Sequence, residues 1–393
     1  MNSSWMPWSQ NWCRSSTSCR MGGLKNSGCL LPIFQLYCWN YLLMASCSWN
    51  IGTCLPEAVV DYLCHKQQQV KTLELITDTT CLGYGCFNAS YLHNFKNLRR
   101  IRWVAGDPEV LEALREILHD NATTLEEIEI DGTSNGGAKR NLIRGNIRLH
   151  QVISLRYNTC EESFLSLKKL TLSGISFEDD YECIPSVFSF HSLTSLTLHN
   201  CAMSNQLFDV LGSAGLRPTP AHLKSFEMSC RGNALKYGGI GSLAGFLSSF
   251  CGLENLSICC AQALTEPFFQ SIRHHKHTLR QFVLHRSMIN THFGYGRRQP
   301  NEDALLKSAF MDLPRLELLG INISPGKLVM HSIHKGNKHD LQLTRNRNIS
   351  SLWIRDTRHW ESFIFGLWHG YDMNIREEMS LTFRVNSFLD SSQ

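Results

Sequence analysis

The sequence of 393 residues has little charge, and its charges of opposite sign nearly cancel. Charged side chains make up 18% of the residues, and 38 basic against 34 acidic residues leave a net charge of +4. This balance is too mild to favour a nucleic acid or an anionic membrane as a partner, so we expect neither. The hydrophobic content of 43% is typical of a folded chain and excludes a largely disordered one.

The short motifs that mark common active sites are also missing. The chain has no Gly-x-Ser-x-Gly nucleophile elbow, no His-Glu-x-x-His metal helix and no Gly-x-x-x-x-Gly-Lys phosphate loop. Gly239, Gly241 and Gly245 come near to a dinucleotide-binding spacing, but the third glycine stands one place too late. We therefore expect no catalytic residue and no cofactor, and we predict that the protein is not an enzyme.

Cysteine and histidine are present, but not in metal-binding or disulfide patterns. The sixteen cysteines form no compact framework, and several, such as Cys201 and Cys260, fall in or just after expected strands as small buried hydrophobes. Reduced cysteines of this kind favour a cytoplasmic or nuclear protein. Histidines gather at 274–277 and 331–339 without the paired-cysteine spacing of a zinc site, so we expect no bound metal.

Residues 1–56 differ in composition from the rest of the chain. They hold five of the nine tryptophans, six of the sixteen cysteines and no acidic residue. Pro32 and Gln35 interrupt their apolar stretch, which disfavours a membrane anchor, and no amphipathic arginine-rich helix of a mitochondrial presequence is evident. We expect an atypical, poorly ordered segment over 1–56 and a repeat domain over 57–393.

From residue 70 onward the chain repeats one pattern, with apolar residues at its first, fourth and sixth positions. Ten copies begin at Val70, Leu98, Leu125, Leu167, Leu193, Leu223, Leu253, Leu279, Leu316 and Ile349. They start 26 to 42 residues apart, which is typical of stacked repeat proteins. The fourth and sixth positions have the periodicity of a strand. We therefore expect Leu196 and Leu198 to point inward, and Ser195 and Thr197 outward.

A helix is expected after most of these strands. The clearest covers Asp107–Asn121, where Pro108 suits the first turn and apolar residues recur at helical spacing. Asp107, Ser204 and Thr265 are of the residue types that cap helices. Further helices are expected at Ser204–Leu211, Ser242–Phe250, Thr265–Ile272, Asn301–Phe310 and His359–Trp368.

One strand and one helix in roughly 26 to 30 residues, with strand endings such as Leu196–Cys201 and Leu256–Cys260, resemble the leucine-rich repeat superfamily in its long, cysteine-containing type. The irregular spacing is similar to that of the F-box-associated repeat proteins abundant in fungi. The resemblance implies an α/β solenoid, a horseshoe with parallel strands on the concave face and helices on the convex face. It also implies a substrate-recognition protein of a cullin–RING ubiquitin ligase. A free-standing repeat adaptor unrelated to ubiquitin is the alternative.

The F-box that such proteins carry before their repeats is not evident. Leu55–Leu63 is superficially similar to the opening of an F-box, but only six residues separate it from Val70. That space does not hold three helices, so we interpret the segment as the helix of a repeat whose strand lies upstream; a remnant of an F-box is the alternative. The adaptor subunit of the ligase is expected as a partner only if the full gene encodes an F-box.

The third, fifth and seventh positions of each copy are expected to face the concave side, where we predict that a protein partner binds. The candidate binding residues are Arg100, Arg102, Glu127, Glu129, Lys169, Thr171, Ser195, Thr197, His199, Glu227, Trp353 and Arg355. Exposed tryptophan and arginine are favoured anchors at interfaces. The alternative is that adjacent basic and acidic residues only neutralise one another across neighbouring strands.

Overall fold

The structure of the protein is a computed structural model, and the chain divides into two compact units, 1–44 and 45–393. The structure describes residues 46–49, 69–77, 94–105, 108–132, 147–153, 164–178, 181–182, 184–213, 222–230, 239–260, 262, 264–286, 313–321, 351–354 and 381–384. All of these belong to the second unit, with which the following description is concerned.

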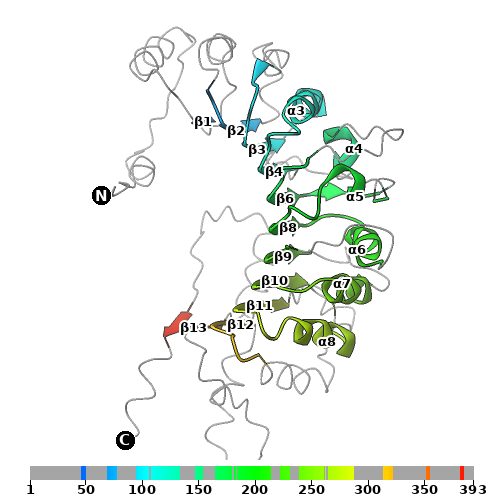
Figure 1. The fold of residues 1–393 in the computed structure, drawn as a ribbon, viewed down its shortest axis with the longest axis vertical. Helices are drawn as coiled ribbons and strands as arrows, with labels where there is room; N and C mark the ends of the chain where they lie inside the picture. The colour runs from blue at the N-terminus through cyan, green and yellow to red at the C-terminus, as the bar shows by residue number, and fades with distance from the viewer. Residues whose placement is uncertain are drawn as a thin grey trace, which may run out of the picture. The chain divides into compact units, whose positions relative to one another are not determined.

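Twelve strands in the described part of the second unit form one sheet, and they follow one another in chain order (Figure 1). The strands are β1 (Ser46–Trp49), β2 (Thr72–Thr77), β3 (Arg100–Ala105), β4 (Glu127–Asp131), β6 (Lys169–Ser173), β8 (Ser195–His199), β9 (Ser225–Ser229), β10 (Asn255–Cys260), β11 (Gln281–Arg286), β12 (Leu318–Ile321), β13 (Ser351–Ile354) and β14 (Leu381–Arg384). Neighbouring strands are parallel from β1 to β13, and only β13 and β14 are antiparallel. The ten predicted copies account for the strands β2 to β13.

The register of the sheet places each pattern position opposite its counterpart in the next copy. At the fourth position, Leu73 lies opposite Ile101, and Leu170 lies opposite Leu196. At the far side of the sheet, Leu319 of β12 lies opposite Leu352 of β13. The place of a residue in its copy therefore decides which row of the sheet it joins.

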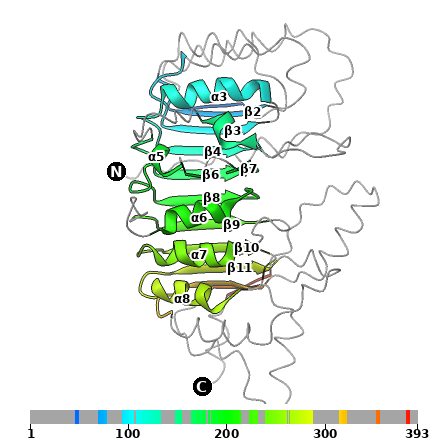
Figure 2. The ribbon, with the colours of Figure 1, turned by 90° about the vertical axis from the view of Figure 1, so that its right-hand side faces the viewer.

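The helices lie together on one side of this sheet (Figures 1 and 2). They are α3 (Pro108–Asp120), α4 (Leu149–Val152), α5 (Ile184–Val187), α6 (Ser204–Gly212), α7 (Gly239–Ser248) and α8 (Glu266–His274). A separate pair of short parallel strands, β5 (Ile147–Arg148) and β7 (Ile175–Ser176), precedes α4 and α5, respectively. The fold is therefore α/β, with a mostly parallel sheet and a helix layer on one face.

The apolar positions of the pattern form the core between the two layers. In the nine copies whose side chains the structure describes, the first, fourth and sixth residues are all buried. Leu196 and Leu198 point inward as predicted, while Ser195 and Thr197 are only partly buried. Each buried aliphatic side chain stabilises the fold by about 1.5 to 3 kcal/mol relative to an exposed one. The repeated pattern thus supplies the hydrophobic layer that holds helices against strands.

Aromatic rings in contact continue this core from one helix to the next. Phe208 of α6 stacks on Phe246 of α7 with ring centroids 5.4 Å apart, and Phe226 of β9 meets both rings edge-on. Phe250 extends the group to His275, at a centroid distance of 5.1 Å. Such pairs add about 0.5 to 1.5 kcal/mol beyond the burial of their area.

The helices confirm four of the predicted ranges; among the predicted caps in the described residues, the position of Thr265 is confirmed and that of Ser204 is wrong. Ser204 is the first residue of α6 and not its cap; the cap position belongs to Met203, at a φ of 59°. The hydroxyl of Ser204 donates to the carbonyl of Cys201 at 2.9 Å. Thr265 does occupy the cap of α8, without a side-chain hydrogen bond. Asp107 and the helices expected at 301–310 and 359–368 lie outside the described residues.

Strand β1 lies within the segment 1–56 that the sequence separates from the repeat domain. Its Ser46 pairs with Thr72 of β2, so the sheet begins upstream of the predicted boundary. Residues 55–63 lie outside the described residues. A strand does precede them, however, as the interpretation of Leu55–Leu63 as a repeat helix requires.

Candidate functional site: the solvent-facing side of the sheet

The strand face is the set of outward residues on β2 to β11, on the side of the sheet away from the helices. Partly exposed and buried residues alternate along the strands, as β8 and β10 show. Because successive side chains of a strand point to opposite sides, the partly exposed ones share one surface. The register then aligns them in rows that run across the strands.

The first row begins with charges and continues with polar groups. Arg100 lies opposite Glu127, which lies opposite Lys169, and Lys169 lies opposite Ser195. In the second row the order is Arg102, Glu129, Thr171, Thr197 and Glu227. With His199, which lies opposite Ser173 in the next row, the structure brings ten of the twelve predicted binding residues onto one surface.

Ion pairs join the charged residues of the first row to one another and to Glu74, which lies opposite Arg102 in the second row. The Arg100 guanidinium lies 3.7 Å from a Glu74 oxygen and 3.6 Å from a Glu127 oxygen. The second Glu127 oxygen lies 3.0 Å from Lys169 Nζ. The four charges alternate in sign over four strands, as the neutralisation interpretation requires. Exposed pairs of this kind contribute about 0 to 1 kcal/mol each, so they order the surface more than they stabilise it.

A shorter ion pair stands in the second row. Arg102 Nε lies 2.9 Å from Glu129 Oε1, and the two side chains remain 43% and 36% exposed. This exposure leaves both groups accessible to a partner while each holds the other in position.

His199 and Glu227 make the corresponding contact farther along the face. His199 Nε2 lies 3.3 Å from Glu227 Oε1. The hydrogen bond from His199 lowers the pKa of the Glu227 carboxyl, against the opposing effect of its partial burial. Glu227 therefore keeps its negative charge to lower pH than an isolated glutamate would.

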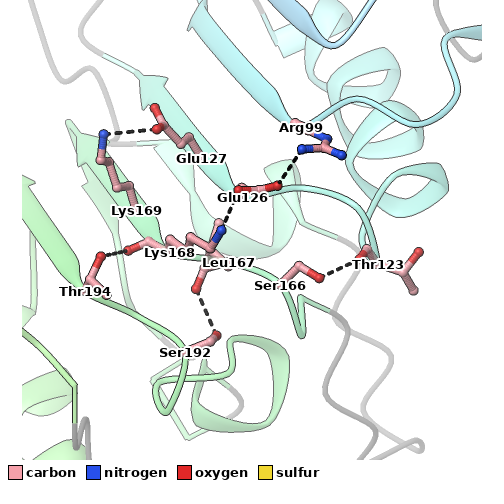
Figure 3. A network of polar contacts seen from close by, with 10 residues as sticks. All are labelled: Arg99, Thr123, Glu126, Glu127, Ser166, Leu167, Lys168, Lys169, Ser192 and Thr194. Atoms are coloured by element: carbon pink, nitrogen blue, oxygen red, sulfur yellow. Dashed lines mark hydrogen bonds and ion pairs between the residues drawn. The ribbon is translucent and has the colours of Figure 1, made fainter. Parts of the chain in front are cut away.

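A second set of charges lies at the second position of the pattern, outside the positions predicted to face the concave side. Arg99, Glu126 and Lys168 form a continuous chain, with N–O distances of 3.4 and 2.6 Å (Figure 3). The ammonium of Lys168 lowers the pKa of the Glu126 carboxyl by hydrogen bonding. The second position also pairs Lys224 with Glu254 at 3.1 Å. The signal was readable in the sequence, because this position alternates in sign over several copies.

The backbone carbonyl at the second position accepts two hydrogen bonds from the next copy. The Glu126 carbonyl accepts the N–H groups of both Lys168 and Lys169, at 2.8 and 3.0 Å. The Lys168 carbonyl accepts those of Thr194 and Ser195 in the same way. This double acceptance recurs from β2 to β12, so it fixes where each strand starts relative to the last.

Hydroxyl groups reinforce the start of the strands in several copies. Ser192 donates to the Leu167 carbonyl at 2.9 Å, and Thr194 donates to the Lys168 carbonyl at 3.1 Å (Figure 3). In the copy at 279, Thr278 donates to the Leu253 carbonyl at 2.8 Å, as Ser192 does in its own copy. These hydrogen bonds join the start of a strand to the preceding copy.

The two remaining candidate residues lie at the far end of the sheet. Trp353 belongs to β13, where its backbone lies opposite Gly320 of β12. Arg355 lies outside the described residues. Their role as anchors stays a prediction.

The described residues contain no group of three or more His, Cys, Asp or Glu side chains placed to hold a metal ion. Nor does any helix among them have the length and apolar character needed to cross a bilayer. Neither a scan against models of known protein families nor a search of curated proteins finds a match for this chain.

Proposed function

We propose that the protein is an interaction scaffold of the leucine-rich repeat type, which binds another protein on its strand face. The observation that carries the proposal is the alignment of polar side chains in rows across parallel strands. The helices that the structure describes all lie on the opposite side of the sheet. Parallel sheets normally have helices on both faces, so a polar face that carries none of the described helices favours a binding surface.

The chemistry of the face fits a partner that offers peptide groups. On β2 to β6 the opposite charges are paired with one another. Beyond them the rows carry hydroxyl and amide groups, including Thr197 of β8, Ser225 of β9, and Asn255 and Ser257 of β10. Neutral groups exchange hydrogen bonds with a partner at a lower desolvation cost than full charges do.

The resemblance noted in the sequence makes the proposal more specific. It favours a substrate receptor of a cullin–RING ubiquitin ligase, in which an F-box docks on the adaptor subunit. The free-standing adaptor unrelated to ubiquitin is the second candidate. Co-purification separates the two: the protein from the full gene should bring down the cullin adaptor if it is a receptor, and its failure to do so would favour the free-standing adaptor.

The binding surface is tested by adding charge to it. Thr197→Arg with Ser257→Arg places two cations on either side of Glu227, where they are electrostatically tolerated. We expect this double variant to lose at least tenfold in affinity for a protein partner identified by cross-linking and mass spectrometry. The matched control is Ser248→Arg with Gln270→Arg, which adds the same charge to exposed positions of α7 and α8.

The comparison has a clear negative outcome. Circular dichroism melts should show both double variants folded like the parent protein. If the strand-face variant then binds every partner as well as the parent does, or if the helix-face variant is the one that fails, the strand face is not the binding surface.

A further inference from the structure

A thiol and an imidazole meet between α7 and α8, away from the strand face. Cys251 follows α7 in the turn that leads into β10, and His274 is the last residue of α8. Cys251 Sγ lies 3.2 Å from His274 Nε2, which is within hydrogen-bonding distance for sulfur. Both side chains are exposed. The fold therefore places a nucleophile beside a base at the surface.

Cys251 differs from the other cysteines that the structure describes. Cys201, Cys230 and Cys260 are buried and Cys259 is partly buried, so Cys251 alone is exposed among the five. Burial raises the pKa of both Cys201 and Cys230 to about 12, which keeps these thiols protonated at neutral pH. Because the thiolate is the reactive form, a reagent reaches a usable nucleophile at Cys251 and not at the buried positions.

The surroundings leave room for an adduct and hold the imidazole in place. Gly252 follows directly, at a φ of +95°, and no atom lies within 4 Å of the point where a Cβ would stand. The ring of His274 packs edge-on against His275, with centroids 5.4 Å apart. His275 is itself fixed by a 2.8 Å hydrogen bond to the Leu247 carbonyl.

We propose that Cys251 is a modification site for small disulfides, activated by His274. The imidazole Nε2 takes the proton of the Cys251 thiol, and the thiolate attacks one sulfur of the incoming disulfide. The disulfide S–S bond breaks as the new S–S bond to Cys251 forms, and the released thiolate leaves with the proton held by His274. The disulfide is the oxidant, and the products are a mixed disulfide on Cys251 and one free thiol.

The test uses glutathione disulfide on the full chain, with the fraction of each cysteine modified read over time by peptide mass spectrometry. We expect Cys251 to react at least about tenfold faster than Cys259. His274→Gln should slow Cys251 by about tenfold or more and leave Cys259 unchanged, because positioned bases typically contribute about 10²-fold or more to proton transfer. Lys276→Gln, which removes an exposed charge two residues from His274, is the matched control and should not change the rate.

The pH dependence distinguishes a base from a merely structural histidine. The ratio of wild-type to His274→Gln rates should be largest near pH 7 and vanish above about pH 9, where thiols ionise without help. Equal rates for Cys251 and Cys259, or a His274→Gln rate equal to that of the parent at pH 7, would overturn the proposal. A loss of rate that is the same at all pH values would assign His274 a structural role instead.

Discussion

In three copies a single polar residue is buried at the same position, in the turn before the strand. Four residues before the first apolar position stand Asn121, Ser189 and His275, all buried. Asn121 shows the pattern most fully: its amide donates to the Phe95 and Ile117 carbonyls and accepts the Leu98 N–H, each at 2.9 Å. A buried polar group is tolerated when its hydrogen bonds are made. The side chains of Asn121 and His275 thus bond backbone groups near the turn, the latter the Leu247 carbonyl at 2.8 Å.

His275 makes the stability of the protein depend on pH. Burial lowers its pKa to about 4, against about 6.5 for a free histidine. Above pH 6.5 the residue is neutral in both the folded and unfolded states. Between about 6.5 and 4 the unfolded chain binds a proton that the folded one does not, so the free energy of unfolding falls as pH falls.

We expect the wild-type protein to lose about 2 kcal/mol more than His275→Gln between pH 7 and pH 5. Urea unfolding followed by circular dichroism at the two pH values measures the difference. Glutamine can still donate to the Leu247 carbonyl, so the variant should remain folded. Parallel losses in the two proteins would show that His275 is protonated in the folded state.

At the scale of elements, α6 and α7 pack closely because of a glycine. A Cβ at Gly212 would stand 3.0 Å from the Phe246 nitrogen and 3.1 Å from the Gly245 carbonyl carbon. An open groove of about 200 Å³ at the same helix pair is lined by residues that include Gly212, Gly241 and Gly245. Gly212 thus permits a close contact between the helices, whereas no atom lies within 4 Å of a Cβ placed at Gly241 or Gly245.

Two substitutions by alanine in these helices should have opposite effects. Gly212→Ala should destabilise the protein by about 1 to 3 kcal/mol, because α7 would have to move away from α6. Gly245→Ala, with nothing within 4 Å of its Cβ, should stabilise it by about 0.5 to 1 kcal/mol through higher helix propensity. Chemical denaturation of both variants checks the pair; destabilisation by Gly245→Ala would mean that α7 needs flexibility there.

The sequence predicted the parts of the fold that periodicity specifies. Leu170 and Leu196 share a row because every copy has the same spacing, and the helix over Pro108–Asp120 follows from its apolar stripe. The pattern could not predict β1 or β14, which belong to no copy, nor the pair β5 and β7, which contains two residues a strand. The Arg99–Glu126–Lys168 chain was missed for another reason: the prediction compared only the third, fifth and seventh positions of the copies, and these charges stand at the second.

Across the whole molecule as described, each strand of the sheet bonds only to the strands before and after it. Stability in such an arrangement is a sum of local terms and nearest-neighbour contacts. Phe226 of β9, for example, contacts the rings of Phe208 and Phe246, on the adjoining α6 and α7. A defect there should spread over neighbouring repeats and fade with distance.

Phe226→Ala should therefore cost about 3 to 5 kcal/mol and do so locally. We expect hydrogen exchange to show faster amide exchange in β8, β9, β10, α6 and α7, while β2 and β3 keep their protection. Ser257→Ala, at a partly exposed position of β10, is the control and should change the protection little. Uniform loss of protection over the sheet would mean that the repeats unfold as one cooperative body.

The carbonyl that receives two N–H groups at the entry to each strand has a consequence for how such a chain can evolve. From β2 to β12, each repeat offers the next one the same backbone carbonyl as an acceptor, whatever side chains surround it. A whole unit can thus be duplicated or deleted in the gene, and the junction that results is chemically the same as before. The number of repeats, and with it the length of the strand face, can therefore change while the contact between repeats stays the same.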